Sequence, residues 1–353
     1  MTLSALTYSA NLLRLATGDR LLRPLTAAYF VTTDCNLNCV YCENYGYDVR
    51  GDRARLQDAL KILHAIRHSV ERLILTGGEP LLHPQIGQLV SAARGEVGFR
   101  HITLISNGLL LPQHEQILPA LDLLVVSLDS TDPEQWHSII GVETSAAALI
   151  LGNIVKYAAR QRELGFHMVA NCVLTPQTLS GATDVLDFCA EHGLMVSFSP
   201  QAVNNWPHYD LLVSDEYKAL LGELLTLKRR GAPIAGSEAY LHSLRGLRPY
   251  SCYPTLTPSI TPAGELVYPC RPVEKGGGAL GGRPASLLEV GSLREALRLA
   301  QAELGTPPRV CNSCFQQCFV EPSLMQARPL SLLYELLRYG ASRRVRLASY
   351  APG

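Results

Sequence analysis

Three cysteines stand close together near the start of the chain, in the run DCNLNCVYC at residues 34–42. Cys35, Cys39 and Cys42 are spaced by four and then three positions, so a compact loop can point all three thiols at one inorganic centre. Three thiolates suit a zinc ion with a fourth ligand, or an iron–sulfur cubane in which one iron stays open. The run therefore predicts a metal or cluster site that can also take a cofactor or substrate.

A second group of five cysteines lies toward the other end of the chain: Cys252, Cys270, Cys311, Cys314 and Cys318. The first two flank a predicted hairpin, and the last three follow as CxxCxxxC. Such cysteines can converge on one centre, as in zinc ribbons and ferredoxin-like sites, and spacing alone does not choose the metal. The remaining two, Cys172 and Cys189, lie in apolar patterns and are expected in the core.

Apolar runs alternate with helical patterns between residues 26 and 230. Strands are expected at 26–33, within 71–80, and at 101–106, 121–129, 167–174 and 194–200; helices are expected at 54–69, 84–94, 112–120, 145–164, 180–192 and 214–230. Continuous apolar strands are typical of parallel sheets covered on both faces. Six strand–helix units with right-handed crossovers predict an α/β fold, a partial (β/α)6 barrel of the TIM type.

Polar and glycine-rich segments follow four of these strands: CNLNC, GGEP, SNG and SLDS. In parallel barrels the residues that do chemistry lie at the carboxyl ends of the strands. Four such segments at one end of the barrel predict a shared site there.

The strand–helix alternation stops after residue 231, where proline and glycine become frequent. We expect an N-terminal helical segment at 1–25, the barrel at 26–231, a small cysteine-rich hairpin and helix extension at 232–325, and an amphipathic helix and tail at 326–353. Within the extension, 259–270 should form the hairpin and 292–304 a helix.

The composition excludes several classes of protein. Apolar residues make up 47% of the 353 residues, which indicates a packed core. The 31 basic and 31 acidic residues cancel, so no nucleic-acid partner is expected. No membrane span or signal peptide is evident, which predicts a cytoplasmic protein. Both ends of the chain are basic and amphipathic, which suggests peripheral contact with the inner face of a membrane; the alternative is that their leucines pack on the barrel.

CxxxCxxC directly after the first strand, with Tyr41 before the last cysteine, resembles the radical S-adenosylmethionine (radical SAM) superfamily. The GGEP turn after the second strand, Gly77 to Pro80, strengthens the resemblance. It implies that Cys35, Cys39 and Cys42 hold a 4Fe–4S cluster whose open iron chelates S-adenosylmethionine. Zinc is the alternative, but it leaves the GGEP turn unexplained.

The resemblance also implies a set of S-adenosylmethionine contacts: Gly77, Gly78, Glu79 and Pro80 around the methionine group, and Ser106, Asn107, Ser127, Asp129 and Asn171 along the nucleoside. The glycines would let the backbone approach the methionine ammonium, and Glu79 would offset its charge. Purely structural roles stay open, since SNG is also an ordinary turn and Asp129 could cap the next segment.

The hairpin pattern C-x11-G-x5-C resembles the SPASM and twitch extensions of this superfamily. The resemblance implies an auxiliary 4Fe–4S cluster held by Cys252, Cys270, Cys311 and Cys314, with Cys318 as the alternative to Cys314. A full SPASM domain has seven cysteines, and this group has five, so we expect two clusters in the whole chain.

The chemistry implied is reductive cleavage of S-adenosylmethionine to a 5′-deoxyadenosyl radical, which takes a hydrogen atom from an unidentified substrate. An external donor such as flavodoxin or ferredoxin would supply the electron. About 25 residues precede the first strand, too few for a peptide-recognition domain, so we favour a small molecule or lipid over a peptide. Arg271 is a candidate contact for a carboxylate or phosphate. The alternatives are a peptide-modifying maturase and an iron–sulfur electron carrier without a substrate.

Overall fold

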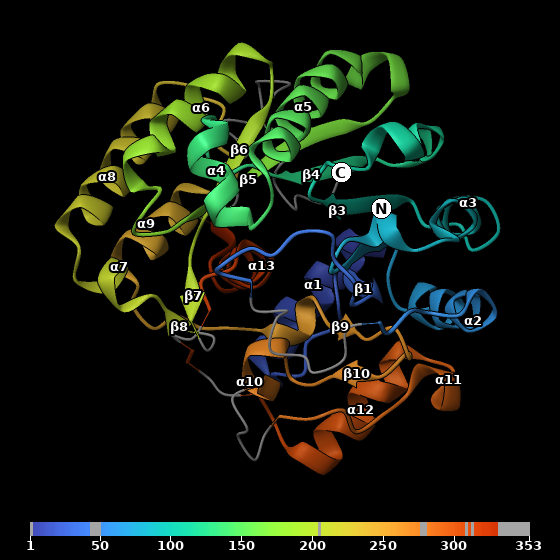
Figure 1. Cartoon of the computed structure of the whole chain (residues 1–353). Coiled ribbons are helices and arrows are strands. Elements are labelled where there is room, and N and C mark those ends of the chain that lie inside the picture. Colours follow the sequence, from blue (N-terminus) through green and yellow to red (C-terminus); the bar gives the residue numbers. More distant parts are fainter. Residues whose placement is uncertain are drawn as a thin grey trace.

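A computed structural model describes residues 3–42, 51–203, 206–275, 281–307, 310–311 and 314–330. Its main feature is an eight-stranded sheet in the order β10-β9-β1-β2-β3-β4-β5-β6, curved into an arc (Figure 1). The six parallel strands are β1 (Ala27–Thr32), β2 (Arg72–Gly77), β3 (His101–Ser106), β4 (Leu123–Ser127), β5 (His167–Leu174) and β6 (Met195–Pro200). The predicted α/β fold with six parallel strands is confirmed.

Helices cover the outer side of the arc (Figure 1). They are α2 (Leu56–Arg67), α3 (Ile86–Arg94), α5 (Thr144–Leu164), α6 (Ala182–Glu191) and α8 (Asp215–Arg229). Helix α4 (Pro133–Ile140) packs on α5 and lies nearer the centre of the view in Figure 1. The helix expected at 112–120 is instead the 3-10 segment η3 (Leu111–Ala120), which is kinked at His114 and contains Pro119. Helix α4 was not predicted, although Asp132 caps its first turn and Pro133 occupies its first position.

The predicted hairpin is present as β9 (Ser259–Ile260) and β10 (Leu266–Val267). Strand β9 pairs in parallel with β1, with Tyr29 opposite Ile260, so the hairpin extends the barrel sheet. The other elements of this part are α9 (Glu238–Gly246), η5 (Pro254–Leu256), α10 (Arg271–Lys275), α11 (Leu287–Val290), α12 (Leu293–Leu304) and α13 (Gln317–Ala327). Helix α12 confirms the prediction for 292–304. Helix α13 was not predicted, because Pro322 and Cys318 interrupt its apolar pattern.

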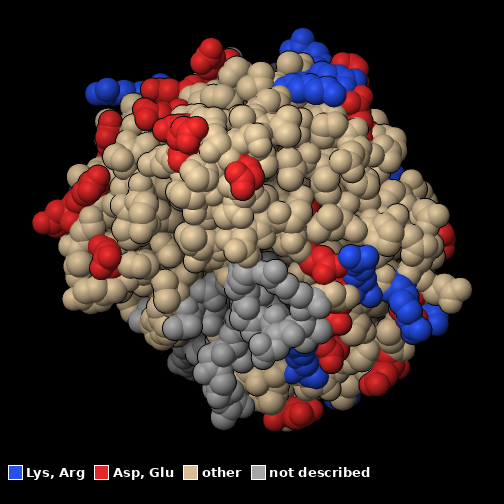
Figure 2. Space-filling view, viewed as in Figure 1, with Lys and Arg blue, Asp and Glu red and all other residues tan. Residues whose placement is uncertain are grey.

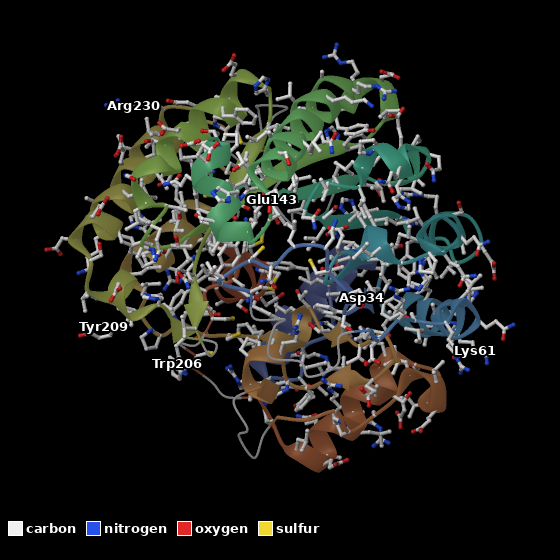
Figure 3. The ribbon with its side chains drawn as sticks, in the orientation of Figure 1. Asp34, Lys61, Glu143, Trp206, Tyr209 and Arg230 are labelled. Atoms are coloured by element: carbon white, nitrogen blue, oxygen red, sulfur yellow. The ribbon has the colours of Figure 1, made fainter. Side chains whose placement is uncertain are left out.

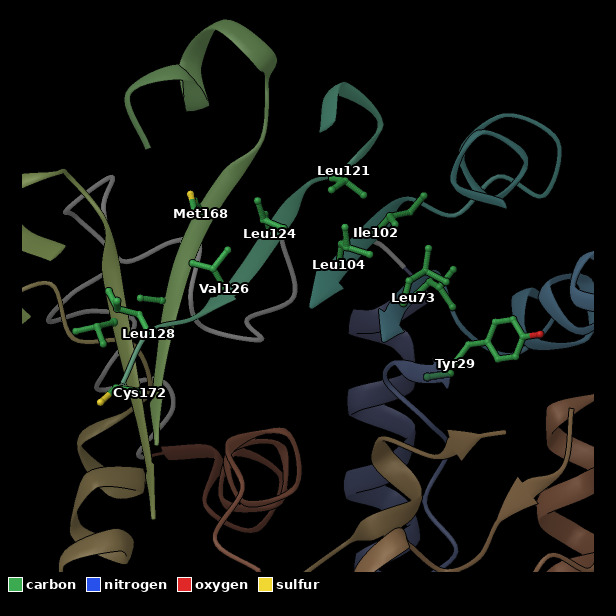
Figure 4. Packing of buried hydrophobic residues seen from close by; sticks show 14 of the residues in the cluster. Tyr29, Leu73, Ile102, Leu104, Leu121, Leu124, Val126, Leu128, Met168 and Cys172 are labelled. Carbon is green, nitrogen blue, oxygen red and sulfur yellow. The ribbon is translucent and has the colours of Figure 1, made fainter. Parts of the chain in front are cut away.

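Buried apolar side chains of the strands and the outer helices form one continuous core. Figure 4 shows part of it, on and beside the strands. Cys172 and Cys189 are fully buried in it, as predicted. The core also includes Ile260 and Leu324, so it runs across the predicted domain boundary at residue 231. That boundary remains a prediction.

The opposite face of the strands is partly open. Along β4 and β5, buried and half-buried residues alternate near the carboxyl ends, and Val125, Ser127, Asn171 and Val173 are half-buried. Because the helices cover the other face, these side chains line the hollow of the arc. Polar and apolar groups are mixed there, as in a binding cavity.

The N-terminal helix α1 (Leu3–Ala16) lies against α13, where the Tyr8 hydroxyl donates to the Met325 carbonyl at 2.8 Å. Leu22 packs with Tyr253 and Leu256, whereas Leu13 is 71% exposed. The basic helix expected after residue 328 lies almost wholly outside the described residues, and membrane contact stays a prediction. Within the described ranges no single helix meets the length and hydropathy of a bilayer span, while α4 and α5 do so together across a 107° bend.

Charged side chains gather toward the rim of the face seen in Figure 2, and most of its centre is uncharged. Three short elements, β7 (Ala202–Val203), β8 (Trp206–Pro207) and α7 (Tyr209–Val213), follow β6. Trp206 and Tyr209 lie at the edge of the view, whereas Asp34 of the first cysteine loop lies near its centre (Figure 3).

Candidate active site

The first three cysteines lie on the loop that follows β1. Cys35 is exposed, and Cys39 and Cys42 are half-buried. Burial raises the pKa of the Cys39 thiol, and Asp129, Cys42 and Cys35 raise it further. The amide of Leu37 donates to the Cys35 sulfur at 3.4 Å. The three thiols therefore lie within electrostatic reach of one another, as the sequence predicts.

The three thiols of this loop are a donor set that is compatible with an iron–sulfur cluster. In the part of the chain that the structure describes, no three His, Cys, Asp or Glu side chains converge tightly enough for one metal ion. A cubane binds its cysteines at separate iron corners, so its ligands stand farther apart than those around one zinc ion. The donor set on this loop fits the larger group.

The GGEP turn closes directly against the cysteine loop. The Gly78 amide donates to the Thr32 carbonyl at 2.9 Å, and the Glu79 amide donates to the Asp34 carbonyl at 2.7 Å. A Cβ added at Gly77 would lie 2.3 Å from the Thr32 oxygen, and one at Gly78 would lie 2.2 Å from the Asp34 oxygen. Both positions thus need glycine so that the end of β2 can approach the loop. That the backbone of Gly77 and Gly78 also lies against the methionine ammonium of the cofactor is still a prediction.

The Glu79 side chain is fully buried below the turn. One carboxylate oxygen accepts from the Leu81 amide at 3.0 Å and from the Ser106 hydroxyl at 2.9 Å. The other accepts from the Asn107 amide at 2.7 Å. Burial raises the pKa of Glu79 to about 7, against these hydrogen bonds, which lower it. Pro80, also buried, starts the 3-10 turn η2 (Pro80–Leu82).

Asn107 connects this buried carboxylate to the cysteine loop. Its Nδ2 donates to Oδ1 of Asn36 at 2.7 Å, and its own Oδ1 accepts from the Leu109 amide at 3.0 Å. Gly108 follows with φ of +85°, so the backbone turns at residues 106–108, which is the structural role that the sequence left open. The sequence analysis did not single out Asn36, whose position inside the cysteine run was the available signal.

Asp129 makes a second connection to the same loop. Its fully buried carboxylate accepts from the Tyr41 hydroxyl, from the Val173 amide at 2.8 Å and from the Trp136 indole at 3.4 Å. Burial raises the pKa of Asp129 to about 6, although these three hydrogen bonds lower it. The carboxylate therefore has three protein donors before any ligand is bound.

Ser127 and Asn171 are placed differently. They are half-buried neighbours in register on β4 and β5. The side-chain Oδ1 of Asn171 accepts from the Ser197 hydroxyl at 3.0 Å, and the Ser127 hydroxyl makes no hydrogen bond with any described residue. Of the predicted nucleoside contacts, these two line the open hollow.

The second group brings all five of its cysteines together. Cys252, Cys270 and Cys314 are buried, and Cys311 and Cys318 are half-buried. A hydrogen bond with Cys311 and burial raise the pKa of the Cys252 thiol, and Cys314 and Cys270 add to the shift. Burial raises the pKa of Cys314, followed by the effects of Cys270, Cys318 and Cys311. Paired backbone hydrogen bonds of 2.9 Å between Tyr250 and Cys311 hold two of the segments together.

A buried hydroxyl faces this second group. Tyr250 Oη is buried and has no hydrogen-bond partner among the described residues. Burial raises the pKa of Tyr250, and the thiols of Cys314, Cys252 and Cys311 raise it further, which places them nearby. A buried donor beside several thiols fits a centre that carries acceptor sulfides.

Arg271 lies beside the second cysteine group and against β1. It directly follows Cys270, and its guanidinium carbon stands 4.3 Å from the ring centroid of Phe30 on β1. Burial raises the pKa of Cys318 to about 12, while Arg271 lowers it, so these two side chains are neighbours. A pocket opens here, and its lining includes Phe30, Gly77, Gly78, Pro262, Arg271 and Arg283. Arg283 is paired with Glu265 at 3.0 Å.

Residues 29–189 match the family model described as the radical SAM superfamily. The chain belongs to this superfamily. A probable GTP 3′,8-cyclase of Methanococcus aeolicus is 25% identical over 192 residues, which cover 51% of this chain and 62% of that protein. A GTP 3′,8-cyclase of Rhodococcus opacus is 29% identical over 224 residues, which cover 60% of this chain and 62% of that protein. The matched regions thus span less than two thirds of both relatives.

Among solved structures, Streptococcus suis SuiB bound to S-adenosylmethionine is similar with a TM-score of 0.60 and 20% identity, over 83% of this chain and 71% of that one. This likeness shows a shared radical SAM fold.

Within this radical SAM fold, the predicted cofactor contacts divide into two sets. Glu79, Ser106, Asn107 and Asp129 are buried and hydrogen-bonded to other protein groups. Ser127 and Asn171 line the hollow. The sequence could not distinguish the sets, because their partners come from distant segments.

Proposed function

We propose that this chain is a radical SAM enzyme that cleaves S-adenosylmethionine and takes a hydrogen atom from a small organic substrate. One electron and S-adenosylmethionine give methionine and the 5′-deoxyadenosyl radical. That radical then takes a hydrogen atom from a substrate C–H bond, giving 5′-deoxyadenosine and a substrate radical. The observation that carries the proposal is the direct closure of the GGEP turn on the cysteine loop, at 2.7 and 2.9 Å.

In this proposal Cys35, Cys39 and Cys42 hold a 4Fe–4S cluster, which supplies the electron and chelates the methionine group when it is bound. Gly77 and Gly78 border the pocket beside this loop. Ser127 and Asn171 offer a hydroxyl and an amide to the ribose and base. The side chains of the buried set already bond to protein groups, so they can contact the cofactor only through remaining lone pairs or through backbone atoms. This set is Glu79, Ser106, Asn107 and Asp129.

An auxiliary cluster at the second cysteine group is part of the proposal. Cys252, Cys270, Cys311 and Cys314 are its proposed ligands, with Cys318 as the alternative to Cys314. The mutual effects of these thiols on their pKa values support the set, as does the buried Tyr250 hydroxyl beside them. Cys318 also acts on the pKa of Cys314, so it stays the alternative ligand.

For the substrate we favour a small molecule or lipid that carries a carboxylate or phosphate near Arg271. Arg271 borders the pocket beside Gly77 and Gly78, and Phe30, Pro262 and Val267 give that pocket apolar walls. The names of the two relatives refer to a small molecule, GTP. Peptide modification is the second candidate within the same chemistry.

The decisive experiment is an anaerobic assay of the reconstituted protein with S-adenosylmethionine and dithionite, followed by quantification of 5′-deoxyadenosine. We expect turnover, and we expect it to rise when the correct substrate is added. Reduced flavodoxin or ferredoxin should replace dithionite if such a cytoplasmic donor serves this enzyme. A chain that takes up clusters but forms no 5′-deoxyadenosine would instead be an electron carrier.

A further inference from the structure

We propose that Asn107 and Asp129 are positioning residues that hold the cysteine loop in its cluster-binding arrangement through Asn36 and Tyr41. This inference deepens the proposed function, because it assumes that the loop binds the cluster. It changes the role of two residues that the family resemblance places along the nucleoside.

The first connection runs from β3 to the front of the loop. Asn107 Nδ2 donates to Asn36 Oδ1 at 2.7 Å, next to Cys35. Asn107 is fixed in turn, because its backbone amide donates to the buried Glu79 and its Oδ1 accepts from Leu109. Both Asn36 and the Glu79 carboxylate thus lie on one hydrogen-bonded path from the GGEP turn to the loop.

The second connection runs from β4 to the back of the loop. The Tyr41 hydroxyl donates to Asp129, whose carboxylate is also held by Val173 and Trp136. Tyr41 lies between Cys39 and Cys42. The anchor is rigid, because Asp129 and Trp136 are both fully buried.

A third contact comes from the backbone. The amides of Asn38 and Val40 donate to the carbonyls of Ile140 and Ile139 at 2.8 and 2.9 Å, at the end of α4. Gly141 makes room for this approach, since a Cβ there would lie 2.6 Å from the Asn38 carbonyl oxygen. The loop is therefore held from β3, β4 and α4.

Restraint from three sides has a physical consequence for cluster binding. Fixing the backbone of a free loop costs conformational entropy at every residue, and a loop that is already ordered avoids that cost when it binds. The side-chain connections should therefore raise cluster retention without touching the cluster. Ser127, on the same strand end but without a bond to the described residues, should not.

Amide hydrogen exchange of the apoprotein tests this ordering without any cofactor. Tyr41→Phe removes one hydroxyl, and Asn36→Ala removes the acceptor of Asn107. Each should speed exchange at Asn38, Val40 and Cys42 by about tenfold, the effect of one lost hydrogen bond. Asn36→Asp keeps an acceptor for Asn107 and should restore slow exchange. Ser127→Ala is the matched control and should leave the loop unchanged.

The reconstituted protein provides the second readout. Iron release to a chelator should be about tenfold faster in Tyr41→Phe and Asn36→Ala than in the wild type, and unchanged in Asn36→Asp. The slow fraction of iron from the second cysteine group serves as an internal standard. Equal exchange and equal iron release in all variants would overturn the positioning role. Because the exchange measurement uses apoprotein, that result is distinct from a failure to form 5′-deoxyadenosine.

Discussion

The two cysteine groups are built in opposite ways. The first takes three thiols from one short loop between residues 35 and 42, and Cys35 is exposed. The second takes five thiols from segments around residues 252, 270, 311 and 314–318, and three of those thiols are buried. The first group is thus local and open, and the second is long-range and enclosed.

The difference separates two tasks. A loop with three thiols leaves one corner of a cubane for a ligand, and its exposure allows that ligand to enter. An enclosed group with at least four thiols can satisfy every iron and excludes water. It also joins four chain segments, so its centre should contribute to folding, whereas the first loop is already held by neighbouring side chains.

The largest expected effect is the loss of activity when only the first cysteine group is removed by mutation. Replacing Cys35, Cys39 and Cys42 together by Ala should abolish formation of 5′-deoxyadenosine, because no open iron remains. About four of about eight irons per chain should stay, since the second group is untouched. Iron analysis and the anaerobic assay measure both. About twelve irons in the wild type, or firmly held zinc, would contradict the two-cluster assignment.

Cys270→Ala should remove the second centre and lower the melting temperature of the reconstituted protein. The reason is that Cys270 joins the hairpin to the segments around Cys252 and Cys314. Cys318→Ala is the matched control and should keep all of the iron, because the four proposed ligands of the second centre remain. If Cys318→Ala loses iron and Cys314→Ala keeps all of it, then Cys318 is the ligand of the second centre and Cys314 is not.

The same contrast explains what the sequence could predict. The strands of the barrel and the GGEP turn are local patterns, and β3 and β5 match their predicted ranges residue for residue. The hairpin was predictable from its turn, but its pairing with β1 was not, since that contact joins Tyr29 to Ile260. Helix α13 lacked a clear apolar period because Pro322 interrupts it.

At the site, residue types were predictable and partners were not. The spacing of Cys35, Cys39 and Cys42 carries its own information, because a short loop limits where the thiols can go. The Tyr41–Asp129 and Asn36–Asn107 bonds join residues 88 and 71 positions apart. No local pattern distinguishes a buried Asp129 that anchors a loop from one that contacts a ligand.

A smaller effect is expected at the junction between β2 and the first loop. Gly78→Ala would place a Cβ 2.2 Å from the Asp34 carbonyl oxygen and should lower the free energy of unfolding by about 1–3 kcal/mol. Binding of S-adenosylmethionine should weaken, while iron at the second group stays. Gly152→Ala in α5 is the control, since nothing lies within 4 Å of the added Cβ. Equal denaturation midpoints in urea for both variants would show that the close approach is unimportant.

The smallest effects are expected at Tyr250, and a different property should change in the apoprotein and in the reconstituted protein. Tyr250 Oη is buried without a hydrogen-bond partner among the described residues, so it is a cost to the apoprotein. Tyr250→Phe should therefore raise the free energy of unfolding of the apoprotein by about 1 kcal/mol. In the reconstituted protein the same change should lower the reduction potential of the second centre, because a donor to its sulfides is lost. Urea titration of the apoprotein and a redox titration followed by electron paramagnetic resonance measure the two effects. The electron paramagnetic resonance spectrum of the first centre should stay unchanged. A change in that spectrum would mean that Tyr250→Phe alters the structure of the protein more widely and does not act on the second centre alone.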